Sequence, residues 1–169
     1  MVIGMSLSAF TTLHVLRSFA ALLAGVIVTV KILQNSDIPL WTWSFLATSF
    51  LVSATGFMFP AQAVLPPHVV GGLSLLIFVA TVPAYLAVKK SGRLRAVYVI
   101  GTLVLFYFNA FVTVVQAFLK VPALHELAPQ GSEPPFAVAQ AVLLVAFVYL
   151  GVRAMRAFRP TPTVVGAAG

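Results

Sequence analysis

Long apolar runs alternate with short polar breaks along this chain, and the alternation predicts a bundle of membrane-spanning helices. A helix needs about 20 mostly apolar residues to cross the hydrocarbon core of a bilayer. Five runs meet this requirement, at about 9–33, 40–59, 68–88, 95–119 and 136–158. Prolines stand beside several of the breaks, where the first turn of a helix tolerates a missing N–H. The predicted fold is an all-α, polytopic transmembrane bundle of five helices.

Residues 1–159 are expected to form a single transmembrane domain, followed by a short disordered tail at 160–169. The longest polar interruption, QAFLKVPALHELAPQGSEPPF at 116–136, separates the last two runs. Its central part, 120–135, is predicted to be a loop that folds over one mouth of the bundle. The acids and the histidine of this loop are His125, Glu126 and Glu133.

The basic residues sort to one side of the membrane if the N-terminus is outside. Eight of the ten then lie at inner helix ends or in inner loops, whereas only Lys120 lies outside, which is a strong positive-inside bias. The eight are Lys31, Lys89, Lys90, Arg93, Arg95, Arg153, Arg156 and Arg159. The prediction is therefore an outer N-terminus, an inner C-terminus and an outer loop at 120–135.

Composition narrows the classes of protein that fit this chain. Its 169 residues are 61% hydrophobic and 8% charged, whereas a soluble domain carries about 25% charged residues. The net charge of +7 comes from residues at the ends of apolar runs, so it does not indicate nucleic-acid binding. Cysteine is absent, which excludes disulfides, thiolate metal sites and cysteine catalysis. The expected partner is the lipid bilayer, and a bundle of this size is compatible with a homo-oligomer.

Arg17 is the one basic residue that lies within the membrane and not at an end of a predicted span or in a loop. It precedes Lys31 by 14 residues, or roughly 21 Å of helix, so it would lie roughly 9 Å below the outer surface of the hydrocarbon core. One interpretation is that its side chain extends outward along its own helix to the interface. The other is that it faces inward and pairs with Glu126, Glu133 or carbonyls of the outer loop, because an unpaired ionisable group in the membrane is costly.

The three histidines all fall on the predicted outer side, and two kinds of cofactor site are considered for them. His14 lies one turn before Arg17, His68 begins the third run, and His125 is in the outer loop. Together with Glu126 they provide ligands suited to zinc or copper. Haem held between His14 and His68 is the second kind of site. The alternative is three unrelated interfacial histidines.

Polar residues in the fourth run share one helical face. Thr102, Asn109, Thr113 and Gln116 follow steps of 7, 4 and 3. Asn109 lies near mid-membrane, where its amide needs a polar partner. The stripe is explained either by hydrogen bonds between helices or by the lining of a polar cavity.

Three segments stand out for their sequence: SATGFMFP (53–60), PPHVVGGLSL (66–75) and FNAFVTVVQAFLKVPALHELAPQGSEPPFAVAQ (108–140). They resemble a family of small, uncharacterised bacterial inner-membrane proteins. The resemblance implies a bacterial inner-membrane location, but it brings no activity, ligand or catalytic residue. In addition, LHVLRSFAALLAG (13–25) is similar to membrane families in which a helix-borne histidine is a suspected haem ligand.

Three functions remain open at this point, and none is clearly enzymatic because no nucleophile, base and orienting residue form a recognisable set. The first is an outer-facing polar pocket that binds or passes a small solute, with an anion among the candidates. Its expected residues are Arg17, Asn109, Gln116, Glu126 and Glu133. The second is a metal- or haem-binding redox component using His14 and His68. The third is an accessory or scaffold subunit.

Overall fold

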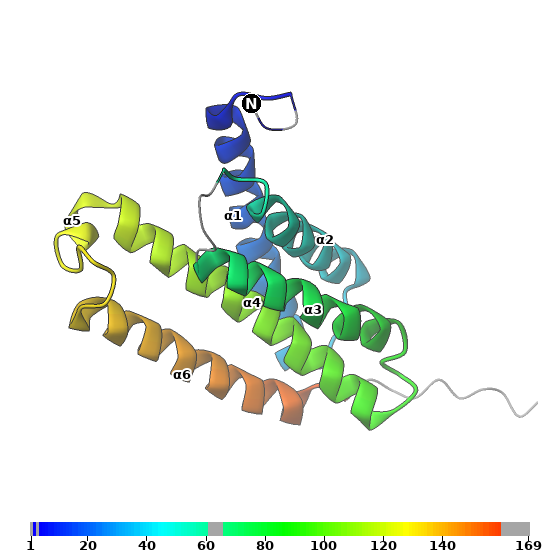
Figure 1. Cartoon of the computed structure of the whole chain (residues 1–169). Coiled ribbons are helices and arrows are strands. Elements are labelled where there is room, and N and C mark those ends of the chain that lie inside the picture. The colour runs from blue at the N-terminus through cyan, green and yellow to red at the C-terminus, as the bar shows by residue number, and fades with distance from the viewer. Residues whose placement is uncertain (1, 3, 61–65, 160–169) are drawn as a thin grey trace, which may run out of the picture.

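The computed structural model describes residues 2, 4–60 and 66–159, and these fold into helices (Figure 1). The six helices are α1 (Leu7–Leu33), α2 (Pro39–Gly56), α3 (Pro66–Leu86), α4 (Gly92–Lys120), α5 (Pro122–His125) and α6 (Pro134–Ala157). The five predicted runs each coincide with a long helix, and their ends differ from the observed ends by at most three residues. The four-residue helix α5 was not predicted and lies inside the expected loop 120–135. The expected tail, 160–169, is outside the described residues.

The helix ends follow local sequence signals. Ser6 and Ser91 precede α1 and α4, and their hydroxyls accept hydrogen bonds from the amides of Ala9 and Leu94, each at 3.2 Å. Such caps satisfy N–H groups that have no partner inside the helix. Proline opens α2, α5 and α6, where its missing N–H costs no helical hydrogen bond.

Within the described part of the chain, four helices, α1, α3, α4 and α6, are long and apolar enough to cross a membrane, and this makes the chain a multi-pass membrane protein. Helix α2 is not among these four. It has only 18 residues, and hydroxyl side chains recur along it. They are those of Thr42, Ser44, Thr48, Ser49, Ser53 and Thr55.

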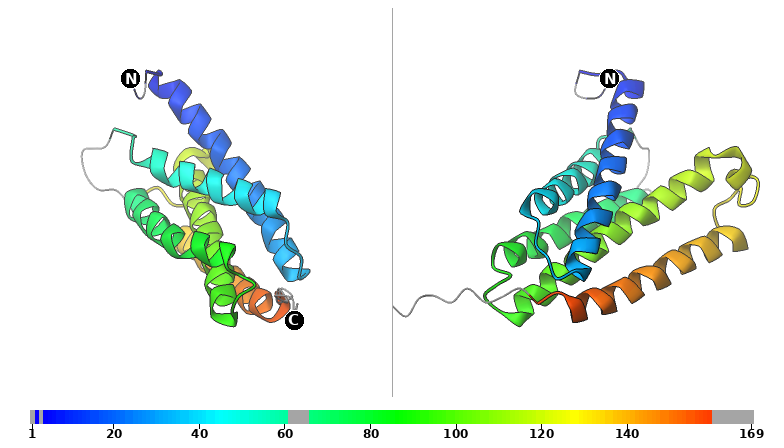
Figure 2. Two further views of the ribbon diagram at one scale, coloured as in Figure 1. Left: turned by 90° about the vertical axis from the view of Figure 1, so that its right-hand side faces the viewer. Right: turned by 180° about the vertical axis from the view of Figure 1, so that it is seen from behind.

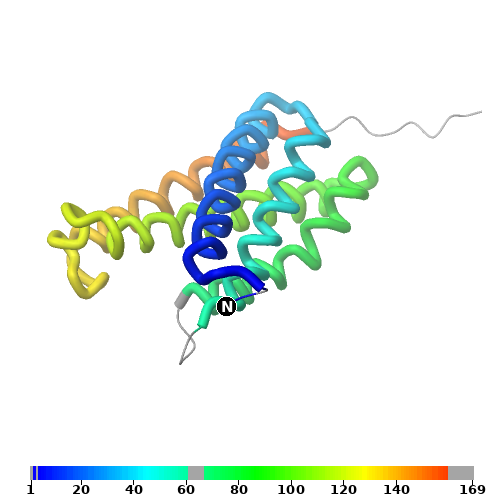
Figure 3. Tube along the Cα trace, turned by 90° about the horizontal axis from the view of Figure 1, so that it is seen from above, coloured from blue at the N-terminus to red at the C-terminus, as the bar shows by residue number. Residues whose placement is uncertain are grey.

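Helix α4 is central to the bundle, since it alone among the described helices contacts all five others. Helices α1 and α2 pack side by side, α3 packs between α2 and α4, and α6 contacts only α4 and α1. The views in Figures 2 and 3 show α6 at the edge of the bundle, with one side turned away from the other helices. Its outward residues are apolar and exposed, including Val142 and Val145 at 64% and 68%, as expected for contact with lipid.

A string of aromatic side chains fills the middle of the bundle. Phe106 of α4 lies between Phe45 of α2 and Phe147 of α6, with ring centroids 6.3 and 5.0 Å apart. Gly25 of α1 faces the same ring, and a Cβ at this position would lie 2.5 Å from an atom of Phe106. The small-residue spacing of Ala21 and Gly25 therefore serves close packing of α1 against α4.

The ends of α1, α3 and α6 meet at one end of the bundle, called here the basic end because the predicted inner cations gather in these segments. The hydroxyl of Tyr85, near the end of α3, donates to Asp37 Oδ1 at 3.3 Å. The amide of Arg159, after α6, donates to Asn35 Oδ1 at 2.6 Å. Arg95 of α4 donates to the carbonyl oxygens of Met155 and Phe158, where α6 ends. Successive long helices therefore alternate in direction.

Candidate functional site

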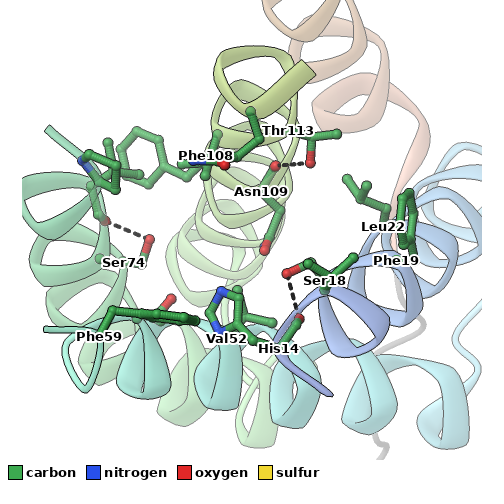
Figure 4. A pocket seen from close by; sticks show the side chains of 18 of the residues that line it. His14, Ser18, Phe19, Leu22, Val52, Phe59, Ser74, Phe108, Asn109 and Thr113 are labelled. Atoms are coloured by element: carbon green, nitrogen blue, oxygen red, sulfur yellow. Dashed lines mark hydrogen bonds between the residues drawn. The ribbon is translucent and has the colours of Figure 1, made fainter. Parts of the chain in front are cut away.

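A cavity of about 360 Å³ lies between α1, α2, α3 and α4, in the half of the bundle away from the basic end. Its lining comes from the first half of α1, the region around the end of α2, the first half of α3 and the second half of α4. Most of these side chains are apolar, and aromatic rings of Phe19, Phe59 and Phe108 stand around the space (Figure 4). The alternating directions of the helices bring these four segments to one level of the bundle.

His14 reaches the cavity from α1 and is held by a helix-to-helix hydrogen bond. Its Nδ1 lies 2.9 Å from the hydroxyl oxygen of Thr55 in α2. The ring also meets Phe59 edge-on, with centroids 5.1 Å apart. These two contacts fix the orientation of the imidazole, and Figure 4 shows it directed into the cavity.

Asn109 reaches the same space from α4, on the side opposite His14 (Figure 4). Its Nδ2 donates to Ser49 Oγ of α2 at 3.0 Å and to the carbonyl oxygen of Leu105 at 2.9 Å. The amide nitrogen therefore links helices, while Oδ1 remains available to the cavity. Asn109 thus packs helices with its nitrogen and lines, with its oxygen, a cavity whose walls are mostly apolar.

The other polar residues of the α4 stripe divide between two places. Thr113 and Gln116 line the cavity, and Lys120 continues the lining at the end of α4. Thr102 is instead fully buried nearer the basic end. His68, at the start of α3, also lines the cavity and contacts the ring of Phe57 with centroids 5.8 Å apart.

Arg17 does not line the cavity, and the predicted ion pair with the outer loop is not formed. Glu133 instead accepts hydrogen bonds from the backbone amides of Gln130 and Ser132, each at 2.9 Å. The hydrogen bond from Gln130 is the main reason that the pKa of Glu133 lies below its usual value of 4.5. The carboxylate stabilises its own loop, so it is not directed at another helix.

The loop between α4 and α6 does not cover the cavity in the way the sequence suggested. Helix α5 contacts only α4 among the helices, and neither Glu126 nor Glu133 lines the cavity. Figure 1 shows α5 at the far end of α4, away from the start of α1. The physical reason is direction: α4 ends at Lys120, close to its predicted end, but α1 and α4 diverge, so the loop lies away from the start of α1 (Figures 1 and 2).

The predicted three-histidine metal site is also not assembled. Among the described residues, no three His, Asp or Glu side chains come close enough to hold a metal ion. His14 and His68 share the cavity, whereas His125 ends α5 outside it.

Sequence reasoning missed the two hydroxyl partners, Thr55 and Ser49, that hold His14 and Asn109 in place. Both belong to the row of hydroxyl side chains along α2, and a hydroxyl in an apolar run does not specify its partner. It also missed Phe59 and Phe108, because an aromatic residue in an apolar run carries no sign of which cavity it lines. Comparisons with protein family models, with curated proteins and with solved structures find no match to this chain.

Proposed function

We propose that this protein is a non-enzymatic, multi-pass membrane protein that binds a small solute in the cavity between α1, α2, α3 and α4. The observation that carries the proposal is the convergence of His14 and Asn109, from different helices, on one apolar-walled cavity. A few fixed polar groups in a mainly apolar cavity are typical of small-molecule sites, whose volumes are roughly 300–1,000 Å³. The cavity volume of about 360 Å³ lies in this range.

The cavity is proposed to face outward, in a bacterial inner membrane. The positive-inside bias puts the basic end inside, so the opposite half, which holds the cavity, faces out. All five long helices are proposed to cross. This is supported by the Tyr85–Asp37 hydrogen bond, which brings the end of α3 to the link between α1 and α2.

The anionic solute considered from the sequence loses its main support, because Arg17 is not at the cavity. Lys120, at the last residue of α4, is the cation among the lining residues. The proposed solute therefore has a largely apolar body that fits the walls.

Filling the cavity tests this function. Val112 of α4 lines the cavity, and Val112→Trp places a large ring in the space. The purified protein is titrated with naphthalene, 1-naphthol and 1-naphthoate, and binding is measured by the fluorescence of each probe. We expect saturable binding of at least one probe by the wild-type protein and its loss in Val112→Trp, with Ser18→Leu on α1 as a second filling variant. Equal binding by wild type and both variants would overturn the proposal and favour a scaffold role.

A second candidate function, redox chemistry with a metal or haem, is favoured by one observation: His14 and His68 line the same cavity. Purified protein with a Soret band, or with stoichiometric zinc or copper that is lost in a His14→Phe variant, would support it. A colourless, metal-free protein that binds a naphthalene probe would favour the solute site.

A further inference from the structure

We infer that the solute is a neutral aromatic alcohol, whose hydroxyl donates a hydrogen bond to Asn109 Oδ1 or His14 Nε2. This inference rests on the proposed function and specifies the chemical class of its solute. It follows from counting which protons of the cavity's polar groups are already engaged. The protons of Asn109 and His14 are engaged, so these two groups present acceptors, and an acceptor selects a donor; Ser53, Gln116 and Lys120 also line the cavity and can donate.

Asn109 has engaged both of its donor positions. An amide side chain carries two N–H donors and one carbonyl acceptor. The donors go to Ser49 Oγ and to the carbonyl oxygen of Leu105, at 3.0 and 2.9 Å. The two bonds determine which end of the amide is oxygen, and that oxygen faces the cavity (Figure 4).

His14 is left with an acceptor by the same reasoning. The hydroxyl of Thr55 donates its single proton to the carbonyl oxygen of Leu51 at 2.5 Å. Thr55 Oγ1 must therefore accept from His14, so Nδ1 of His14 carries the proton. In the neutral ring the other nitrogen, Nε2, then has a free lone pair.

Of the five hydroxyls that line the cavity among the described residues, all but that of Ser53 are engaged in the same way. Each of these four donates to the carbonyl oxygen four residues earlier in its own helix, at 2.8–2.9 Å. This is a common bond for hydroxyl residues inside helices. These residues are Thr11, Ser18, Ser74 and Thr113. Each hydroxyl oxygen therefore offers lone pairs to the cavity, and its proton points away.

The walls determine the rest of the ligand. Phe19, Phe59 and Phe108 surround the space (Figure 4), and aromatic rings favour stacked or edge-on contact with another ring. An empty apolar cavity of about 150 Å³ accommodates benzene. A cavity of about 360 Å³ therefore has room for a bicyclic ring or a ring with a short tail. A carboxylate beside Asn109 Oδ1 and His14 Nε2 is disfavoured because it would place its charge among acceptors, whereas the cation of the lining, Lys120, lies at the end of α4.

The test compares four probes that share one ring system. They are 1-naphthol, 1-methoxynaphthalene, naphthalene and 1-naphthoate. We expect 1-naphthol to bind roughly tenfold more tightly than 1-methoxynaphthalene, since the ether keeps the shape and loses the one hydrogen bond. Binding that persists in Val112→Trp is subtracted as partition into detergent or lipid. This ranking is made in the wild-type protein and needs no variant of Asn109 or His14.

Two variants assign the acceptor. Asn109→Leu and His14→Phe each keep the side-chain volume close to the original and remove one acceptor. We expect at least one of them to bring 1-naphthol to the affinity of 1-methoxynaphthalene while naphthalene binding is retained. Gln140→Leu is the matched control, because this amide of α6 lies at the contact with α4, donates to the carbonyl oxygen of Phe111 and does not line the cavity.

The outcomes separate this inference from the proposed function. If the three neutral probes bind equally and all are lost in Val112→Trp, the cavity binds solutes but the donor requirement is wrong. If 1-naphthoate binds most tightly, the cavity selects an anion and the inference is overturned. If no probe binds saturably, the proposed function fails as well.

Discussion

At the scale of single residues, Glu133 links the pH to the stability of the loop before α6. Its folded-state pKa is lowered, chiefly by the hydrogen bond from the Gln130 amide. A lowered folded pKa contributes stability that is present above the usual value of 4.5 and is lost as the pH falls through the folded pKa. We predict that Glu133→Gln has a lower Tm than wild type at pH 7, and that the difference shrinks below pH 4.5.

The control for this pH series is Glu126→Gln, seven residues earlier in the same loop and exposed to solvent. Its carboxylate makes no hydrogen bond or ion pair among the described residues. Its Tm should follow that of the wild-type protein at every pH. A Glu133→Gln curve parallel to wild type from pH 7 to pH 3 would show that the carboxylate does not stabilise the loop.

At the scale of the helices, the end of α6 depends on an arginine from another helix. Arg95 of α4 donates to the carbonyl oxygens of Met155 and Phe158. These oxygens accept no hydrogen bond within α6, because the last carbonyl groups of a helix have no N–H partner in it. A cation at this end also interacts favourably with the helix dipole. We predict that Arg95→Gln lowers stability by about 1–2 kcal/mol, measured by chemical unfolding. Arg93→Gln, at an exposed position two residues earlier, should have little effect.

The positions of the helices could be predicted from the sequence, but their partners could not. Apolar run length and flanking prolines determine where a helix begins and ends, and these signals are local. The partner of Glu133 depends on a turn at Gly131, whose φ of 68° lets the chain fold back on itself. Without that turn, Arg17 was the obvious partner for an outer carboxylate. The same limit applies to Asn109. Its spacing in the sequence placed it on a polar helix face, but its hydrogen bonds to Ser49 and to the Leu105 carbonyl decide which end of the amide faces the cavity.

At the scale of the whole molecule, the arrangement of helices gathers the positive charge at one end, and the proposed orientation follows from that distribution of charge. The Arg159–Asn35 and Tyr85–Asp37 hydrogen bonds bring the ends of α1, α3 and α6 to one level. The segments that meet there carry most of the positive charge, whereas the cavity opens in the other half. A membrane-spanning arrangement with the cavity outside satisfies both the alternating helix directions and the positive-inside bias.

This orientation is testable with single cysteines, because the chain contains none. Gln34 follows α1 at the basic end and Gln130 lies in the α4–α6 loop, and both are exposed glutamines. We predict that Gln130→Cys reacts with a membrane-impermeant maleimide in intact cells, and that Gln34→Cys reacts only after permeabilisation. The two substitutions are chemically identical and leave every charge in place, so they do not disturb the charge bias that determines topology. Labelling of Gln34→Cys alone in intact cells would reverse the orientation, and would place the cavity on the inner side.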